Sequence, residues 1–554
     1  MRSLTPGCLH STTPVCLSGD DLTIDQVVAV ARYGAAVELD TAARARMRAA
    51  RVVVEQALVR GDAVYGMTTG LGPLARLHMN PEQWEEALIP TIVGHSVTNG
   101  EQLDTATVRA MMLARANSMA KGGVGVRVEV VHALVAMLNE GVHPIVHHGG
   151  SVGEADLAEM AQIAQVLIGL GEAEFHGRRL PGNEALAAAG LRPMRLQAKE
   201  ALGMISANGI TLGQGSLVLA DLDDALYTFA ISSALALEGY GGNLSIIHPV
   251  AARLKPHPGQ RRAADLLRHL LEGSYLWDAG MPRNLQDPLS FRCIPQTHGA
   301  CYDADTYVRR MMEIELNAAG DNPLVSVEDQ SIISVGNFDV LNLAIGFDTL
   351  RIALAQVLQI ANERVQKQLW SHFSDLPTGL RLANGPQSGL LPLARSCAAL
   401  TAEARLLANP VSLTYRAQIA EGIEDQGSMA PLGVRKLQEL LRVASRLAAL
   451  ELIVAARAID LRGQRILGRG TRVAYDVVRS YLPADTPGWE TGIEPLVAET
   501  TSGRLAARIR DALDREEVPA IEQPLVLDLL TVLPLHGSST AAAALLGLSQ
   551  RAGC

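Results

Sequence analysis

Two side chains in glycine- and proline-bearing segments could carry acid–base and carboxylate-binding chemistry. Tyr65 lies in VYGMTTGLG (Val64 to Gly72), and Arg292 lies in QDPLSFRCIPQTHG (Gln286 to Gly299). A phenol can remove a proton where nearby donors or charges stabilise its phenolate, and close glycine backbone can supply such donors. A guanidinium fork matches the geometry of a substrate carboxylate. Taken alone, a tyrosine in a glycine loop is more often structural, so further motifs must support this chemistry.

Both segments resemble motifs of the histidine and phenylalanine ammonia-lyases, the aromatic amino acid ammonia-lyase family. The family loop reads VYGxNTGFG and carries the catalytic base, and the second motif reads QDPYSxRCxPQxxG, whose Arg holds the substrate carboxylate. Thr68 and Leu289 replace the family's Asn and Tyr, so some loop hydrogen bonds and one polar contact differ. Four further segments follow in family order: SANG (Ser206 to Gly209), DNPL (Asp321 to Leu324), GNF (Gly336 to Phe338) and IEDQGSMAP (Ile423 to Pro431). The similarity spans roughly Leu22 to Arg510.

Comparison with the family motifs, residue by residue, implies most of a substrate site. The predicted catalytic residues are Tyr65, Asn208 and Glu424. The predicted substrate contacts are Arg292, His95, Gln286, Phe338, Glu154 and Leu391, and no metal ligand is predicted. Each has a plain structural alternative: Asn208 could form a turn, Glu424 could be a surface charge, and His95 could be a core histidine with satisfied hydrogen bonds.

The segment GSVGEADL (Gly150 to Leu157) departs from the family. Family lyases read GSVGASGDL, and the Ala-Ser-Gly tripeptide cyclises and dehydrates into a methylidene-imidazolone electrophile. Here only Glu154 and Ala155 stand between Gly153 and Asp156, so the segment is one residue shorter. It has neither the serine that would lose water nor the glycine amide that would close the ring. We therefore expect no electrophile and no other cofactor.

This loss restricts the leaving group of an elimination. In the family, the electrophile captures the substrate amine while the tyrosine removes a β-proton. An unassisted primary amine leaves poorly, whereas a quaternary ammonium leaves as a neutral tertiary amine. The best substrate is therefore a betaine with a ring on its β-carbon. Within the family, the ergothionase group resembles this chain in lacking the electrophile, and it splits ergothioneine into thiolurocanate and trimethylamine. We predict this activity, with hercynine or another aryl betaine as open alternatives.

Glu154 has two interpretations that the sequence leaves open. Its carboxylate could attract a trimethylammonium head where the electrophile would have stood. It could equally be an acidic residue favoured by the dipole of a helix beginning near Leu157.

Two other functions compete with the betaine lyase. One is an ammonia-lyase or aminomutase acting on histidine or another aromatic amino acid, which would have to work without the electrophile. The other is a catalytically silent homologue that serves as a binding or structural partner. Retention of Tyr65, Asn208, Arg292 and Glu424 favours an active enzyme, because an idle site has no physical need for all four.

These residues must be positioned by a mainly helical fold. The pattern from Leu22 to about Arg60 is helical, with Thr23 and Asp25 where a cap would lie. Three later stretches, 341–364, 390–407 and 434–461, are apolar on most sides, which is typical of the middle of a helical bundle. The resemblance implies the ammonia-lyase fold, related to fumarase and aspartase. The predicted organisation is an N-terminal extension (1–21), a loop-rich region (22–195), and a bundle with C-terminal helices (196–554).

Composition excludes several partner classes for this chain of 554 residues. A formal charge of −10 offers no general attraction to nucleic acid. The first residues lack the apolar stretch of a secretory signal, and the uncharged run 529–550 is interrupted by proline and glycine, so we expect neither a membrane span nor a membrane partner. Six scattered cysteines without a CxxC pair suggest reduced thiols. We expect a cytoplasmic enzyme with a small-molecule betaine substrate, and the resemblance implies a homotetramer with shared active sites.

Overall fold

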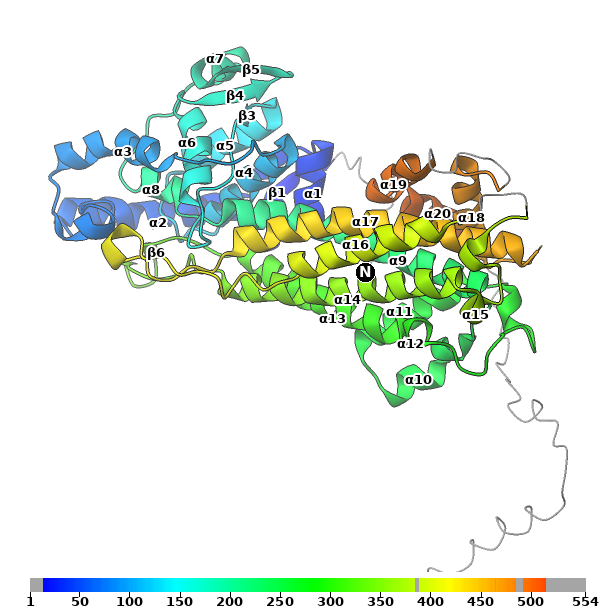
Figure 1. The fold of residues 1–554 in the computed structure, drawn as a ribbon. Helices are drawn as coiled ribbons and strands as arrows, with labels where there is room; N and C mark the ends of the chain where they lie inside the picture. Colours follow the sequence, from blue (N-terminus) through cyan, green and yellow to red (C-terminus); the bar gives the residue numbers. More distant parts are fainter. Residues whose placement is uncertain (1–12, 384–387, 464, 485–491, 515–554) are drawn as a thin grey trace, which may run out of the picture. The chain divides into compact units, whose positions relative to one another are not determined.

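The computed structural model describes residues 13–383, 388–463, 465–484 and 492–514. Those up to Leu513 form one compact unit, which is mainly helical, as predicted (Figure 1). The uncharged run 529–550 lies outside the described residues. The division of the chain near residue 195 stays a prediction.

The N-terminal part begins with a short parallel strand pair, β1 (Val15–Leu17) and β2 (Val37–Leu39). Helix α1 (Ile24–Tyr33) lies between them in sequence, and α2 (Thr41–Arg60) follows β2. Thr23 caps α1 as predicted, in a capping box with Gln26, but Asp25 lies in the first turn and not at the cap. The prediction of continuous helix over 22–60 is wrong, because α1 ends at a left-handed glycine and β2 separates the two helices.

The next segments build the region that carries the predicted Tyr65 and Glu154 loops. It contains α3 (Pro81–His95), α4 (Thr105–Ala120), α5 (Val128–Glu140), α6 (Leu157–Leu167), α7 (Gly182–Ala188) and α8 (Glu200–Ile205). A small antiparallel sheet, β3 (His143–Pro144), β4 (Glu172–Phe175) and β5 (Arg178–Pro181), lies beside them.

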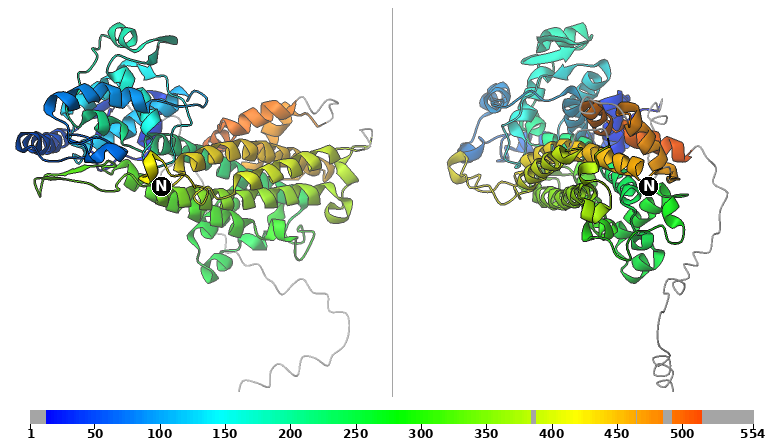
Figure 2. Two further views of the ribbon diagram at one scale, coloured as in Figure 1. Left: turned by 60° about the vertical axis from the view of Figure 1, so that its left-hand side comes forward. Right: turned by 45° about the vertical axis from the view of Figure 1, so that its right-hand side comes forward.

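Long helices form the bundle: α9 (Gly209–Tyr240), α13 (Ile294–Leu316), α14 (Leu341–Leu369), α16 (Leu391–Leu407) and α17 (Ala430–Leu461). The three predicted helical stretches are confirmed as α14, α16 and α17. Helix α17 packs along α9 and α14, and Figure 2 shows these helices side by side from two further directions. Helix α9 is buried on nearly all sides, whereas α16 buries one face only, so α16 is less enclosed than its composition predicted.

Smaller elements surround the bundle. They are η3 (Leu244–Ile247), α10 (Pro249–Leu254), α11 (Pro258–Leu270), η4 (Tyr275–Trp277), α12 (Leu289–Arg292), β6 (Leu324–Ser326), β7 (Ser331–Ile333), α15 (Ser371–Ser374), η5 (Thr378–Leu380), α18 (Arg469–Tyr481), α19 (Ile493–Thr501) and α20 (Arg504–Asp514). Helix α14 is long and apolar enough to cross a membrane, but 61% of its most apolar window is buried in the protein, as in a core helix of a bundle.

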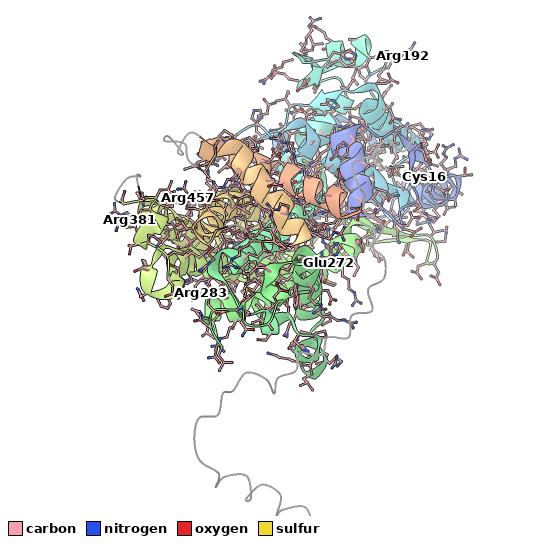
Figure 3. The ribbon with its side chains drawn as sticks, turned by 90° about the vertical axis from the view of Figure 1, so that its right-hand side faces the viewer. Cys16, Arg192, Glu272, Arg283, Arg381 and Arg457 are labelled. Carbon is pink, nitrogen blue, oxygen red and sulfur yellow. The ribbon has the colours of Figure 1, made fainter. Side chains whose placement is uncertain are left out.

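A buried ion pair joins two of the central helices. Arg364 of α14 donates to Glu451 of α17 at 2.6 Å, and Glu451 also accepts the hydroxyl of Ser232 in α9 at 2.6 Å. At the α9 C-terminus, Arg283, which Figure 3 labels, donates to the Tyr240 carbonyl at 2.9 Å and lies over the Tyr240 ring. The two contacts of Arg283 hold the segment before α12 against the C-terminal end of α9.

Candidate active site

The Tyr65 loop is closed by its own backbone. The amides of Met67, Thr68 and Thr69 all donate to the Val64 carbonyl. The Thr68 hydroxyl accepts the Val64 amide at 2.8 Å and donates to the Asp62 carbonyl at 2.7 Å, so this residue supplies local bonds where the family has Asn. The phenol oxygen of Tyr65 accepts the Gly72 amide at 3.0 Å. This hydrogen bond fixes the position of the oxygen that a catalytic base would use to take up a proton.

The Glu154 turn (Gly150 to Asp156) lies at the position that the sequence resemblance assigns to the family's electrophile. Gly153 and Ala155 both have left-handed φ angles, 86° and 65°. The Ala155 amide donates to Asn208 Oδ1 at 3.2 Å, and Asn208 Nδ2 donates to the Phe338 carbonyl at 2.7 Å. The backbone of Glu154 also pairs with that of Asp339. The structure therefore brings three predicted site residues, Glu154, Asn208 and Phe338, into one group.

Residues 153–156 do not fit the cyclisation chemistry of the family. Ser151 is the nearest serine, and its hydroxyl donates to Asp156 Oδ1 at 2.6 Å and accepts the Gly153 amide at 2.9 Å. No hydroxyl lies at Glu154 or Ala155, so this turn offers no atom for the dehydration step.

The segment IEDQGSMAP wraps the other side of the turn. Ser428 donates its amide to Glu154 Oε1 at 3.0 Å and its hydroxyl to the Gly153 carbonyl at 2.7 Å. The Glu424 carbonyl accepts the Tyr415 hydroxyl at 2.9 Å, which fixes the loop. Burial, and to a lesser extent the charges of Asp339 and Glu424, raise the pKa of Glu154 to about 8, although the hydrogen bond from the Ser428 amide acts in the opposite direction. The Glu154 carboxyl therefore lies within electrostatic reach of two more acids.

Four helices begin at residues that touch this turn. Helix α6 follows it directly, α9 follows Asn208, α14 follows Asp339, and α17 follows Ser428. Each N-terminus carries a partial positive charge of about half an elementary charge. The charges of Asp339 and Glu424 offset this field, and Glu154 does so when it is ionised.

The Tyr65 loop and His95 adjoin elements that carry parts of this group. The loop after Tyr65 continues into η2 (Gly72–Arg76), which packs against η6 (Ala420–Gly422), just before Glu424. The ring Nδ1 of His95 lies 2.6 Å from the Thr91 carbonyl. The carbonyl of the neighbouring Ser96 accepts a hydrogen bond from the side-chain amide of Gln162 in α6 at 3.1 Å. His95 therefore lies beside the helix that follows the Glu154 turn.

The remaining predicted residues lie far from this group within one chain. Gln286 and Arg292 lie on either side of Ser290 in the sequence. The Ser290 carbonyl accepts a hydrogen bond from Arg364 at 3.3 Å, and Arg364 comes 23 residues after the first residue of α14. At about 1.5 Å per residue this is roughly 35 Å along the helix from the Glu154 turn. Arg292 itself donates to the Asp287 carbonyl at 2.7 Å. Leu391 begins α16, near the contact of Ala394 with Gln366, and is equally remote. A single chain thus does not assemble the predicted site.

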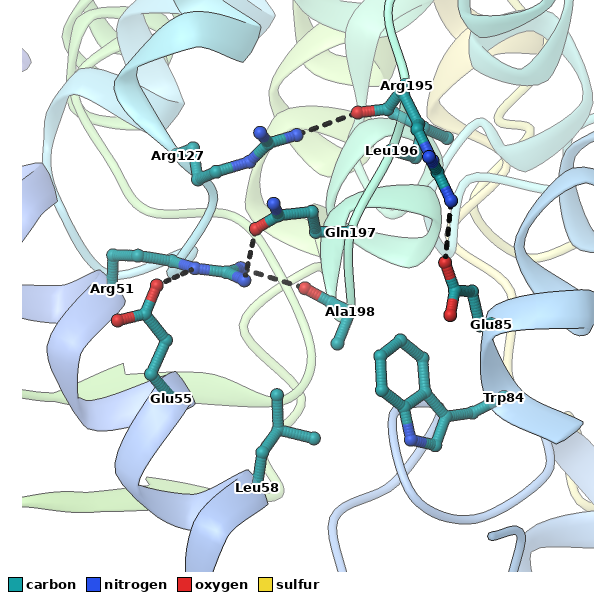
Figure 4. Close-up of a pocket in the computed structure, with 10 residues that line it drawn as sticks. All are labelled: Arg51, Glu55, Leu58, Trp84, Glu85, Arg127, Arg195, Leu196, Gln197 and Ala198. Carbon is teal, nitrogen blue, oxygen red and sulfur yellow. Dashed lines mark hydrogen bonds and ion pairs between the residues drawn. The ribbon is translucent and has the colours of Figure 1, made fainter. Parts of the chain in front are cut away.

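Two cavities lie near the Tyr65 loop. One of about 520 Å³ lies between α2, α3 and the segment 195–198 (Figure 4), and none of the predicted site residues lines it. Its arginines are paired: Arg51 with Glu55 and Arg195 with Glu85, at 3.1 and 3.2 Å. The second, about 310 Å³, lies behind the loop and includes Gly66 and Leu71 in its lining. Neither cavity replaces the group around Glu154 as the candidate site.

Sequence reasoning missed three residues of this group. Asp339 directly follows the GNF motif, Ser428 lies inside IEDQGSMAP, and Tyr415 lies eight residues before that motif. Their positions beside recognised motifs were the available signal for Asp339 and Ser428. Tyr415 has no such signal, because only the folded loop brings its hydroxyl to Glu424.

The chain matches the model of the aromatic amino acid lyase family over residues 22–480. It belongs to this family. It is 36% identical over 467 residues to the histidine ammonia-lyase of Alkaliphilus oremlandii, covering 84% of this chain and 92% of that enzyme. With the histidine ammonia-lyase of Symbiobacterium thermophilum it shares 38% over 462 residues, 83% and 91% of the two chains. The family confirms a carbon–nitrogen lyase scaffold.

Solved structures confirm the predicted fold. The ergothionase of Treponema denticola superposes with a TM-score of 0.85 at 29% identity, covering 89% of this chain and 99% of that one. The tyrosine aminomutase of Streptomyces globisporus gives the same TM-score and identity, covering 91% and 100%. The fold therefore accommodates eliminations and aminomutase reactions alike, and the choice among them depends on the residues of the site.

Proposed function

We propose that this enzyme eliminates trimethylamine from an aromatic betaine without a built-in electrophile, with ergothioneine as the best candidate substrate and thiolurocanate as its product. The observation that carries the proposal is the Glu154 turn. An encoded Glu-Ala dipeptide occupies the electrophile's place, and its carboxyl faces further acids rather than a serine-derived ring.

The elimination needs only groups that this chain supplies. Tyr65 removes a β-proton, the electrons of that C–H bond form the Cα–Cβ double bond, and the C–N bond breaks as trimethylamine leaves with its electron pair. The leaving group is neutral and needs no proton or covalent activation. Asn208 and Glu424 border the reacting carbons, His95, Gln286, Phe338 and Leu391 would contact the substrate ring, and Arg292 would hold the carboxylate in a two-pronged contact.

The charges around Glu154 suit a permanent cation. A trimethylammonium cannot donate hydrogen bonds, so its recognition depends on nearby negative charge and on aromatic faces. Asp339 and Glu424 supply charge, and Glu154 adds its own when the cation favours its ionised form; together they counter the positive ends of four helices that would otherwise repel a cation.

The proposed active enzyme is a homotetramer with shared sites. Arg292, Gln286 and Leu391 lie roughly 35 Å from the Glu154 turn in the same chain, so they would have to come from neighbouring copies. This arrangement also fits the apolar side chains Leu285 and Leu289, which are 96% and 62% exposed beside Arg292 in a single chain.

A second candidate is an ammonia-lyase acting on histidine. The sequence relatives favour it, because histidine ammonia-lyases share 36–38% identity with the chain over most of its length. Against it stands the Glu154 turn, which lacks the atoms to form the group that activates a primary amine.

A substrate comparison separates the two candidates. Purified enzyme is incubated with ergothioneine, hercynine or histidine, and both trimethylamine and ammonia are quantified. We expect trimethylamine from at least one betaine and little or no ammonia from histidine. Rapid release of ammonia from histidine would overturn the proposal in favour of the second candidate.

A further inference from the structure

A buried glutamate outside the recognised motifs touches the Glu154 turn. Glu159 lies in the first turn of α6 and is 1% exposed. Its Oε1 accepts the amide of Gly150 at 3.0 Å, nine residues back in the chain. Burial raises the pKa of Glu159, and the nearby Gly149 and Gly150 amides only partly oppose this. Burying a carboxyl costs free energy unless hydrogen bonds or an opposite charge compensate it, so the contact with Gly150 matters for this side chain.

Glu159 occupies a position in α6 at which a glutamate commonly caps its own helix. It is the third residue of a helix capped by Asp156, where a glutamate normally bonds back to the cap amide. Here the Asp156 amide donates instead to the Ala207 carbonyl at 2.7 Å. The Glu159 carboxyl is therefore not used to cap its own helix, and it reaches the start of the turn instead.

Gly150 is fitted closely to this contact. A Cβ on Gly150 would lie 2.3 Å from Ala158 Cβ and 3.3 Å from Glu159 Oε2, so no side chain fits there. Oε2 makes no hydrogen bond of normal geometry with the described residues. The carboxyl thus holds one backbone amide and closes one side of the turn.

The other parts of the turn are held by different groups. Asp156, fully buried, accepts the Ser151 hydroxyl at 2.6 Å and the amides of Ile210 and Thr211 at 2.9 and 3.1 Å. Ser428 holds Gly153 and Glu154 from the opposite side. Upstream, the backbone of His148 pairs with Gly100 and Glu101 at 2.8 and 2.9 Å, and between these two anchored parts Glu159 holds the Gly150 amide.

We propose that Glu159 is a positioning residue for Glu154: by holding the Gly150 amide it fixes the start of the turn and so aims the Glu154 carboxyl at the cationic head of the substrate. This inference rests on the proposed function in one respect, namely that Glu154 contacts that head. Glu159 touches no substrate and acts only through the turn.

A double-mutant cycle tests this coupling. Glu159→Ala removes the acceptor, Glu159→Gln keeps it, and each is combined with Glu154→Gln. The readouts are kcat and KM for ergothioneine. We expect Glu159→Ala to raise KM by about tenfold, the effect of one buried hydrogen bond. Glu159→Gln should restore most of the affinity, and Glu159→Ala should add little in the Glu154→Gln background.

A matched control separates positioning from loss of stability. Glu238 is also fully buried and accepts a glycine amide, that of Gly468 at 2.8 Å, near the C-terminus of α9. Glu238→Ala should lower the midpoint of thermal unfolding while leaving KM unchanged. If Glu159→Ala does not fold, Glu159→Asp, which withdraws the carboxyl by one methylene, replaces it in the cycle.

The results of these measurements distinguish the role of Glu159 from the proposed function. An unchanged KM in Glu159→Ala, or an equal loss in both backgrounds, overturns the positioning role while the proposed function stands. If Glu154→Gln itself has no effect on the betaine, the cation contact fails, and the role of Glu159 fails with it. Release of trimethylamine by the wild type is measured separately and decides the proposed function.

Discussion

The pH dependence of betaine binding follows from the surroundings of Glu154. Its pKa of about 8 means that the free enzyme holds this carboxyl mostly protonated at neutral pH. A trimethylammonium keeps its charge at every pH and favours the ionised carboxylate. Binding should therefore release a proton, and affinity should rise with pH up to about 8.

The size of the effect can be worked out from the pKa. About half of Glu154 is ionised at pH 8 and about 1% at pH 6. If only the ionised form attracted the cation, affinity would fall about fiftyfold over this range. Binding by the neutral form reduces this factor, so we expect a fall of about ten- to fiftyfold.

Calorimetric titration measures both the affinity and the proton. A Tyr65→Phe enzyme is titrated with ergothioneine at pH 6, 7 and 8 in two buffers that differ in ionisation enthalpy. We expect a net release of protons on binding at pH 6 and 7, which approaches one proton per ligand if affinity falls fiftyfold and is smaller if it falls tenfold. Glu154→Gln in the same background is the control and should bind with little dependence on pH. An equal pH dependence in the Gln variant, or proton uptake on binding, would refute the reasoning.

Three further predictions concern the base, the shared site and stability. Tyr65→Phe should lower kcat by about a thousandfold with ergothioneine affinity nearly unchanged, because it removes a proton acceptor and little volume; equal turnover would exclude Tyr65 as the base. Tyr65→Phe and Arg292→Ala chains, each inactive alone, should regain part of the wild-type activity when they are co-expressed, since mixed oligomers contain some intact sites. If mixed oligomers form but activity does not recover, both residues belong to the site of a single chain. The thermal unfolding midpoint should fall between pH 6 and 8.5, because burial raises the pKa of Glu154 to about 8 and those of Asp156 and Glu315 to about 7. The folded chain then binds more protons than the unfolded chain, stability is lost as pH rises through these values, and Glu154→Gln should reduce the fall.

Much of the fold could be predicted because long apolar helices leave a strong pattern. The stretches that became α14, α16 and α17 were clear from composition alone. The break between α1 and α2 was not, because β2 has only three residues and its partner, β1, lies in the predicted N-terminal extension. Strands this short leave too little alternation to separate them from the neighbouring helices.

The motifs indicate a set of candidate site residues but not their arrangement in space. Motifs identified Tyr65, Asn208 and Glu424, and the missing tripeptide drew attention to Glu154. The hydrogen-bond partner of the Glu154 carboxyl could not be predicted from the sequence, because Ser428 is 274 positions away and meets Glu154 only in the folded chain. The distance between Arg292 and Glu154 in one chain was also hidden, since motifs do not reveal how far apart their residues lie in the folded chain.

The central claim is that this enzyme works without a built-in electrophile. Intact mass spectrometry on a preparation that actively releases trimethylamine tests it most directly, because cyclisation and dehydration of the chain would remove two waters. We expect the encoded mass, with Glu154 and Ala155 unmodified between Gly153 and Asp156. A mass lower by two waters, localised to a peptide containing Glu154, would contradict it.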